Sequence, residues 1–267
     1  MKPGYLLYCD DSGGEDAAVR AVASVSGPAK VLLLLERDLR RILALERVAE
    51  MKWAALRTRP ARLRAAKGFL ELAAVALGAG VLRVDLLLWR PADQGLAYQR
   101  RSEPQRLRPL YFQAWAQALA AWPAARWRLH PDQRTGMHWQ QWPAPLKRRF
   151  SQGGRRLLAL AEADSQRSTC VQLADLLAGL ARLGAEAAPP ARPPGKAAHA
   201  EPRPQDGAQA GADRPGEAAR RNRRELLEHF RDALRRRGVG LPEGPGLLNS
   251  RHPLLQARLL KRLPIQA

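Results

Sequence analysis

One long segment of biased composition divides this chain and limits what the rest can fold into. Residues 184–219 are rich in Ala, Pro and Gly, contain almost no large apolar residue and show no periodicity. Such a segment cannot bury enough apolar surface to offset the entropy that is lost on folding. We therefore expect a folded domain over residues 1–185, a disordered linker over 186–219 and a short basic helical tail over 220–267.

Outside this segment, strand-like and helix-like patterns follow one another. Short apolar runs closed by Asp, Gly or Pro indicate buried strands, and longer stretches with apolar residues at helical spacing indicate helices. Strands are expected over residues 4–9, 18–26, 81–89, 126–132 and 155–163. Helices are expected over 29–57, either continuous or broken once, and over 61–78, 107–121, 168–183 and 220–237. This order is typical of an α/β fold.

The charge of the chain is unevenly distributed. The formal net charge is +20 at pH 7, but residues 1–50 carry −1, residues 51–150 carry +13 and residues 151–267 carry +8. A basic excess is typical of proteins that bind a polyanion, because Lys and Arg near phosphates release counterions. Only 7 of the 45 basic residues are Lys, so a GC-rich genome is an alternative explanation. Charge alone therefore leaves nucleic-acid binding open.

Apolar content and cysteine usage exclude several classes of protein. The longest nearly apolar stretch without a charge, residues 72–82, is far shorter than the roughly 20 residues of a membrane-spanning helix. The N-terminus carries no visible secretory signal. Two cysteines, Cys9 and Cys170, cannot form a disulfide framework and suit a reducing compartment. We expect a cytoplasmic protein with no membrane partner.

Acidic residues stand out where strands end and inside an otherwise apolar helix. Asp10 and Asp11 end the first strand, Glu50 lies on the long predicted helix, Asp132 closes a strand, and Asp175 is flanked by leucines. Carboxylates from separate elements repel one another when they are desolvated together, and a divalent cation removes that penalty. Hard oxygen ligands suit Mg²⁺ or Mn²⁺, and a two-metal site would activate water for phosphodiester cleavage.

Four short motifs carry a resemblance that covers roughly residues 4–185. They are Tyr8-Cys9-Asp10-Asp11-Ser12-Gly13, Glu50-Met51-Lys52-Trp53, Asp132-Gln133-Arg134 and Gln172-Leu173-Ala174-Asp175-Leu176-Leu177-Ala178-Gly179. Together they resemble the uncharacterised bacterial and phage family catalogued as domain of unknown function 3800, which is similar to the ribonuclease H-like superfamily. The resemblance implies a mixed central sheet with helices on both sides and a metal-binding carboxylate cluster.

The same resemblance implies a role for each matching residue. The catalytic and metal-binding acids would be Asp10, Glu50, Asp132 and Asp175, which would hold two Mg²⁺ or Mn²⁺ ions with Asp11 and Gln172 in support. Lys52 and Arg134 are candidate phosphate contacts in a nucleic-acid substrate. The prediction is a divalent-metal-dependent nuclease that hydrolyses phosphodiester bonds of RNA or DNA.

Two departures from the family pattern leave alternatives open. Asp11 stands where the family usually has Glu, and Pro131 interrupts a polar strand before Asp132 where the family tends to be apolar. Asp164 could therefore supply the third acid in place of Asp132. The alternative function is a non-catalytic nucleic-acid-binding or protein-interaction module that keeps the fold without the chemistry.

Overall fold

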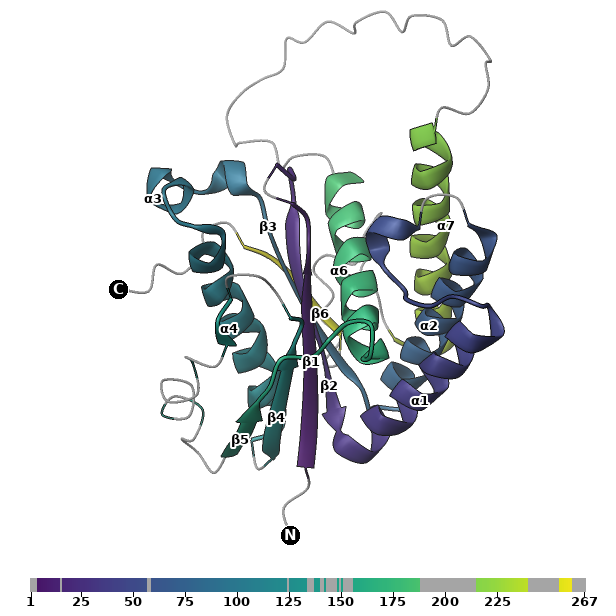
Figure 1. The fold of residues 1–267 in the computed structure, drawn as a ribbon, viewed down its shortest axis with the longest axis horizontal. Helices are drawn as coiled ribbons and strands as arrows, with labels where there is room; N and C mark the ends of the chain where they lie inside the picture. Colours follow the sequence, from purple (N-terminus) through teal and green to yellow (C-terminus); the bar gives the residue numbers. More distant parts are fainter. Residues whose placement is uncertain are drawn as a thin grey trace, which may run out of the picture.

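The computed structural model places one mixed sheet between two layers of helices (Figure 1). It describes residues 4–14, 16–56, 59–123, 125–133, 137–139, 142, 148, 150, 156–187, 215–239 and 255–260, the last of these for their backbone only. Most of the predicted linker and the candidate phosphate contact Arg134 lie outside the described residues. The α/β class that the sequence predicts is confirmed.

Six described strands make up the sheet, in the order β5-β4-β1-β2-β3-β6. The central three form an antiparallel meander, while β4 runs parallel to β1, β5 parallel to β4, and β6 parallel to β3. Their bounds are β1 Gly4–Ser12, β2 Arg20–Pro28, β3 Arg83–Trp89, β4 Arg126–Pro131, β5 Arg156–Leu160 and β6 Leu255–Leu260.

The helices divide unequally between the two faces of this sheet (Figure 1). One face carries α1 (Ala29–Leu45), α2 (Pro60–Gly78), α6 (Thr169–Ala187) and α7 (Pro215–Arg236), and the other face carries α4 (Glu103–Ala121). Short helical segments are η1 (Trp53–Ala55), η2 (Pro91–Asp93) and α3 (Leu96–Gln99). None of the helices within the described ranges is long and apolar enough to cross a membrane.

Side chains of β1 alternate between two separate cores, as the geometry of a strand requires. Leu6 and Tyr8 belong to the core under α1, α2 and α6, whereas Leu7 and Cys9 belong to the aromatic-rich core under α4. The strand continues to Ser12, beyond the predicted end at Cys9, so the segment expected to be a turn from Asp10 onwards is still strand. Asp10 and Asp11 therefore point to opposite faces of the sheet.

Helix α1 ends twelve residues before the predicted end, which is a correction to the sequence analysis. The helix stops at Leu45, and Arg47 adopts a positive φ of 54°. The Val48 N–H then donates to the Leu43 carbonyl at 2.9 Å, which closes the helix end. Glycine normally takes this left-handed position, and its absence hid the stop signal. Glu50 consequently lies in the loop after α1 and not on a helix.

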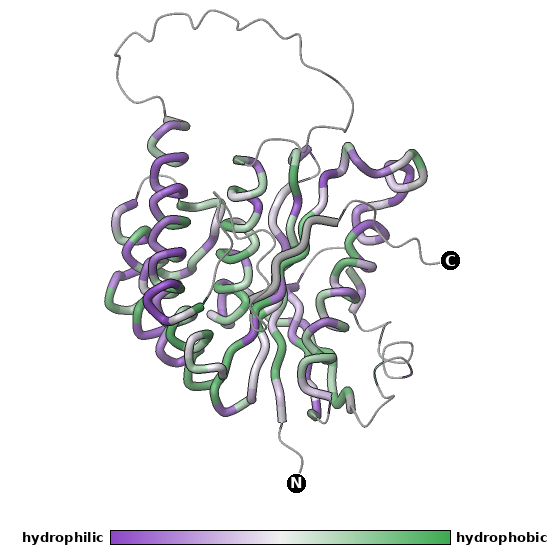
Figure 2. Tube along the Cα trace, turned by 180° about the vertical axis from the view of Figure 1, so that it is seen from behind, coloured by the Kyte–Doolittle hydropathy of each residue, from purple (hydrophilic) through white to green (hydrophobic). Residues whose placement is uncertain are grey.

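The basic helix expected over residues 220–237 begins at Pro215 and belongs to the folded domain. Its apolar stripe, which includes Leu226, Phe230 and Leu234, is fully buried in the same core as α1, α2 and α6. The outer side of α7 remains strongly hydrophilic, as Figure 2 shows along most of the helix. The segment Leu255–Leu260 joins the sheet beside β3.

Candidate functional site

Three carboxylates from separate elements converge on the α6 side of the sheet. Asp10 lies on β1, Asp132 follows β4, and Asp175 lies in the middle of α6. Parallel pairing aligns the first two, because Cys9 lies opposite Pro131 and the Asp132 N–H donates to the Cys9 carbonyl at 2.8 Å. This register places Asp10 and Asp132 side by side near the C-terminal ends of two adjacent parallel strands.

The electrostatics of the three acids show that they share one poorly solvated environment. Burial raises the pKa of Asp10 well above its ordinary value, and the charges of Asp175, Asp132 and Asp11 raise it further. Burial likewise raises the pKa of Asp132 and of Asp175 to about 6. Opposing this, Lys52 and backbone N–H donors lower both pKa values without cancelling the effect of burial. The folded chain therefore holds carboxylates together at an electrostatic cost.

Helix α6 fastens the loop after α1 to this cluster. The Trp53 N–H donates to Asp175 Oδ2 at 2.7 Å, and the Met51 N–H donates to Gln172 Oε1 at 2.8 Å. The Gln172 side-chain amide also donates to the Ser165 carbonyl at 2.6 Å. Since Gln172 and Asp175 are three residues apart on one helical face, α6 presents both side chains to the same loop. Gln172 thus supports the site by positioning backbone.

The ring of Trp53 packs directly on Gly179 of α6. A Cβ atom at Gly179 would lie only 2.1 Å from Cδ2 of Trp53, so a larger residue would push the ring away. Gly179 is four residues after Asp175 and therefore lies on the same helical face. The motif from Gln172 to Gly179 acts as one surface that holds residues 51–53 in place.

Glu50 lies at the edge of the cluster, beside a cavity of about 410 Å³ that Asp132 and Lys52 also line. Glu50 Oε1 accepts a hydrogen bond from the Ser165 hydroxyl at 2.9 Å and lies 3.3 Å from the Lys52 ammonium. Its charge contributes to the raised pKa of Asp132. Glu50 is therefore close to Asp132 but already has a hydroxyl donor and a cation as partners.

Lys52 is a cation close enough to the cluster for its charge to lower the pKa of Asp132 and of Asp175. Burial lowers the pKa of its ammonium, but the charges of Glu50, Asp132 and Asp10, with a hydrogen bond to Glu50, outweigh burial and raise it. The ammonium is half-exposed at the mouth of the cavity. It can therefore contact an anionic group that enters there.

Asp11 supports the end of β1 from the opposite face of the sheet. The Tyr111 hydroxyl donates to Asp11 Oδ1 at 2.9 Å, and the guanidinium of buried Arg20 lies 3.9 Å from Oδ2. Arg20 also pairs with Glu103 at 2.5 Å and lies over the Trp89 ring at 5.4 Å from its centroid. Asp11 is thus part of a paired network that anchors β1 to α4.

The geometry distinguishes between the two candidates for the third acid. Asp164 lines the same cavity, but its Oδ1 accepts the Gln166 N–H at 2.9 Å and its Oδ2 lies 3.6 Å from Arg167. Its backbone carbonyl accepts from Ser168 at 2.9 Å, so Asp164 forms the turn that leads into α6. The charge of Asp132, in turn, is one of those that raise the pKa of Asp10. Asp132 is therefore the acid that belongs to the cluster.

The donor chemistry of the cluster suits a hard divalent cation. Asp132 Oδ1 is buried and has no hydrogen-bond partner among the described residues, and neighbouring acids raise the cost of its charge. Carboxylate oxygens of this kind are the preferred ligands of Mg²⁺ and Mn²⁺. Within the described ranges, no three His, Cys, Asp or Glu side chains form a group that could hold a metal ion as they stand. The carboxylates would have to move closer together around a cation.

Two supporting residues escaped the sequence analysis. Ser165 contacts both Glu50 and Gln172, yet its sequence surroundings are typical of a polar loop. Arg20 is fully buried at the start of β2. A charged residue inside an alternating apolar strand was the signal in the sequence that could have pointed to a buried ion pair. The Ser165–Glu50 and Arg20–Glu103 contacts join residues that lie far apart in the sequence, so local patterns could not predict them.

Comparison with known proteins identifies two similar chains. Both are from Methanothermobacter thermautotrophicus and are named "Uncharacterized protein ORF2'" and "Uncharacterized protein ORF2". Each is 29% identical to this chain, over 195 and 201 residues, which is 66% and 67% of this chain. The matches cover 66% and 68% of these relatives, so the chain spans about two thirds of their length. No family model matches the chain.

Proposed function

We propose that this protein is a divalent-metal-dependent nuclease that hydrolyses phosphodiester bonds of RNA or DNA. The observation that carries the proposal is the buried convergence of Asp10, Asp132 and Asp175, which raises the pKa of each carboxyl. Acids with raised pKa values that converge from separate elements are typical of functional sites, because holding their charges together destabilises the fold. The mixed sheet with helices on both faces supports the ribonuclease H-like interpretation of the fold.

Asp10, Asp132 and Asp175 would hold Mg²⁺ or Mn²⁺, with Glu50 completing the ligand set. When bound, two such ions supply an activated water and stabilise the leaving oxygen of the cleaved phosphodiester. The chain itself orients the ligands: the Asp11 N–H donates to Asp10 Oδ1 at 2.7 Å, and the Trp53 N–H donates to Asp175 Oδ2 at 2.7 Å. Each of these two carboxylates keeps its second oxygen for another partner.

Lys52 would act on the substrate. Its half-exposed ammonium lies at the cavity beside Glu50 and Asp132, so an incoming phosphate would meet a positive charge before it met the acids. The raised pKa of Lys52 keeps that charge at neutral pH. Without this cation, the acids would repel a polyanionic substrate.

A non-catalytic nucleic-acid-binding or protein-interaction module is the second candidate. The observation that favours it is the state of Glu50, which is satisfied by Ser165 and Lys52 without a metal ion. A module of this kind would bind its partner equally well after the acids are neutralised. The two functions therefore differ in their response to Asp→Asn substitutions.

The test is a degradation assay on RNA, DNA and RNA–DNA hybrid substrates with Mg²⁺ or Mn²⁺. Asp10→Asn and Asp175→Asn should each reduce metal-dependent cleavage by about a thousandfold, since each removes a charged metal ligand. Asp38→Asn is the matched control, because Asp38 is a half-exposed acid on α1 that pairs with Arg37 and Arg41, away from the proposed site. Activity that persists in both site variants would contradict the nuclease proposal.

A further inference from the structure

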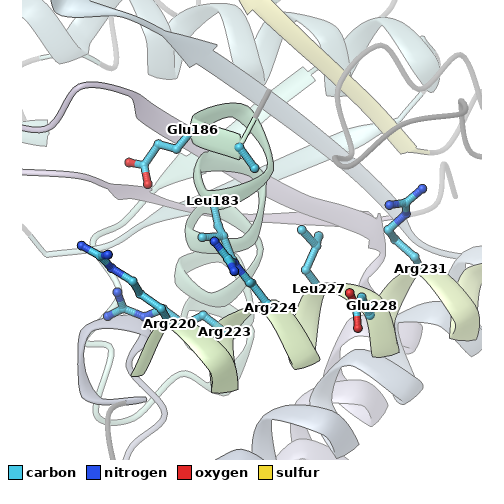
Figure 3. A pocket seen from close by; sticks show the side chains of 9 residues that line it. Leu183, Glu186, Arg220, Arg223, Arg224, Leu227, Glu228 and Arg231 are labelled. Carbon is cyan, nitrogen blue, oxygen red and sulfur yellow. The ribbon is translucent and has the colours of Figure 1, made fainter. Parts of the chain in front are cut away.

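A second cavity, distinct from the acidic cluster, lies between the C-terminal end of α6 and the N-terminal half of α7. Its volume is about 480 Å³ (Figure 3). Four arginines of α7 line it, together with one acid from each helix: Arg220, Arg223, Arg224, Arg231, Glu186 and Glu228. We refer to this cavity as the arginine groove. Figure 3 shows the arginines along α7, with Glu186 across from them on α6.

The spacing of these residues explains why they share one groove. Arg220, Arg224, Leu227 and Arg231 follow one another at intervals of three or four residues, which places them on one face of a helix. The apolar residues of α7 lie beside this face and are buried in the core. Because their burial fixes the rotation of the helix about its axis, the arginines stay directed toward α6. The groove is thus built by the docking of α7.

Three of the four arginines in the groove have no acidic partner among the described residues, whereas two arginines in the last turn of α7 are paired. Near the C-terminus, Arg235 pairs with Asp232 at 3.0 Å and Arg236 pairs with Glu71 of α2 at 2.6 Å. By contrast, Arg220, Arg224 and Arg231 form no ion pair with any residue that the structure describes. Across the groove, Glu186 already pairs with Arg182 on its own helix at 3.3 Å. The groove therefore keeps an excess of positive charge.

One residue connects the arginine groove to the acidic cluster. The Arg223 guanidinium lies over the Trp53 ring, 4.9 Å from its centroid. The backbone N–H of the same tryptophan donates to Asp175 Oδ2. Trp53 therefore lies between the two sites, although residues 53, 175 and 223 are far apart in the sequence.

We propose that the arginine groove binds the phosphate backbone of a nucleic acid and leads it to the acidic cluster. This inference rests on the proposed nuclease function, and it names the route by which the substrate arrives. Guanidinium groups bind phosphates with paired hydrogen bonds, and spaced arginines on one helix face can contact successive phosphates. The described lining is Arg, Glu, Leu and Ala, which offers no stacking platform for bases. Binding is therefore independent of base sequence.

The binding test uses the full chain in EDTA, so that cleavage does not interfere. Fluorescence anisotropy follows labelled single-stranded DNA and RNA of about 12 nucleotides over a series of salt concentrations. The variant Arg220→Ala/Arg224→Ala should weaken binding about tenfold, and the slope of log Kd against log salt should fall by about 1.4 for two lost phosphate contacts. Both side chains are exposed, so the fold should tolerate the change.

The matched control is Arg37→Ala/Arg41→Ala on α1. These arginines are also exposed and also four residues apart, so the control removes the same charge from another helix. It should keep the Kd and the salt slope of the unmodified protein. Equal loss in both double variants, or no loss in the groove variant, would overturn the proposed groove. Arginine-dependent binding to phosphatidylserine vesicles with no binding of either oligonucleotide would also overturn it.

The outcome is separable from that of the nuclease assay. Asp38→Asn should bind the oligonucleotides as the unmodified protein does, since Asp38 lies on α1 and lines neither the groove nor the acidic cavity. If no substrate is cleaved but binding still depends on Arg220 and Arg224, the nuclease proposal fails and the groove stands. If cleavage depends on Asp10 and Asp175 but binding ignores the groove variant, the groove fails and the nuclease proposal stands.

Discussion

Asp10 and Asp11 are neighbours in the chain but lie in opposite electrostatic environments on the two faces of the sheet. On the α4 face, Asp11 accepts a hydrogen bond from Tyr111 and faces the buried guanidinium of Arg20. On the α6 face, Asp10 faces Asp132 and Asp175, whose charges raise its pKa further than burial alone. A buried cation offsets the electrostatic cost of burying an acid, so the fold itself accounts for such a pair. Buried acids that face one another repel, and a cation from outside the chain is needed to offset that repulsion.

The strongest test of this contrast is to remove the cation on the α4 face. Arg20→Met should lower the free energy of unfolding by about 3–5 kcal/mol, because it leaves Asp11 and Glu103 without their buried partner. Arg41→Met is the control, since Arg41 is exposed and pairs with the half-exposed Asp38 on α1; it should cost less than about 1 kcal/mol. Urea unfolding measures both. Similar small losses would mean that the Arg20 network does not anchor β1.

The second test is directed at the support of the α6 face. Gly179→Ala should lower the free energy of unfolding by about 1–3 kcal/mol, because the added methyl group would overlap the Trp53 ring. Gly95→Ala is the matched control, since a Cβ at Gly95 would meet no atom within 4 Å; its effect should stay within about 0.5 kcal/mol. Thermal and urea unfolding compare the two. Equal stability of both variants would contradict the tight packing of Trp53 on α6.

The third test uses the pH dependence of stability. Burial raises the pKa of Asp132 to about 6, so the folded chain binds this proton more tightly than the unfolded chain does. The charge on Asp132 therefore destabilises the fold increasingly as the pH rises from about 4 to about 6. In EDTA at about pH 7.5, Asp132→Asn should be more stable than the unmodified protein by about 1 kcal/mol, allowing for solvent screening.

This stability difference should disappear below about pH 4, where both forms of residue 132 are neutral. Millimolar Mg²⁺ or Mn²⁺ should raise the Tm of the unmodified protein and leave that of Asp132→Asn nearly unchanged, since ligands stabilise only the state that binds them. Differential scanning fluorimetry measures each comparison. An Asp132→Asn variant that is less stable at neutral pH would show that the carboxylate has a buried partner.

The smallest expected effect concerns the loop that carries Glu50. Arg47 holds a positive φ of 54°, which costs an L-residue free energy that glycine does not pay. Arg47→Gly should therefore raise the free energy of unfolding by about 0.5 kcal/mol. Arg37→Gly, inside the same helix, should lower it by about 1 kcal/mol. A loss of stability in both variants would contradict the left-handed helix end.

Local patterns predicted the order of strands and helices well, and they marked three acids that the structure brings together. Asp132 was correctly expected at the end of a strand, and Asp175 stood out as a carboxylate in an apolar helix. The prediction failed at Glu50, because the apolar periodicity of α1 continues past Leu45 and no glycine marks the stop at Arg47. The ribonuclease H-like fold and the nuclease activity stay predictions.

The sequence by itself determined which residues can be buried, which can carry charge and in what order the elements follow. Only the tertiary structure decided that Asp10 and Asp11 face opposite cores, because this depends on β1 continuing to Ser12 and on its register beside β4. It also decided that α7 lies against α2 and α6, so that Arg223 covers Trp53. The contacts of β1 with β4 and of Trp53 with Arg223 join residues more than a hundred positions apart, which no local pattern encodes.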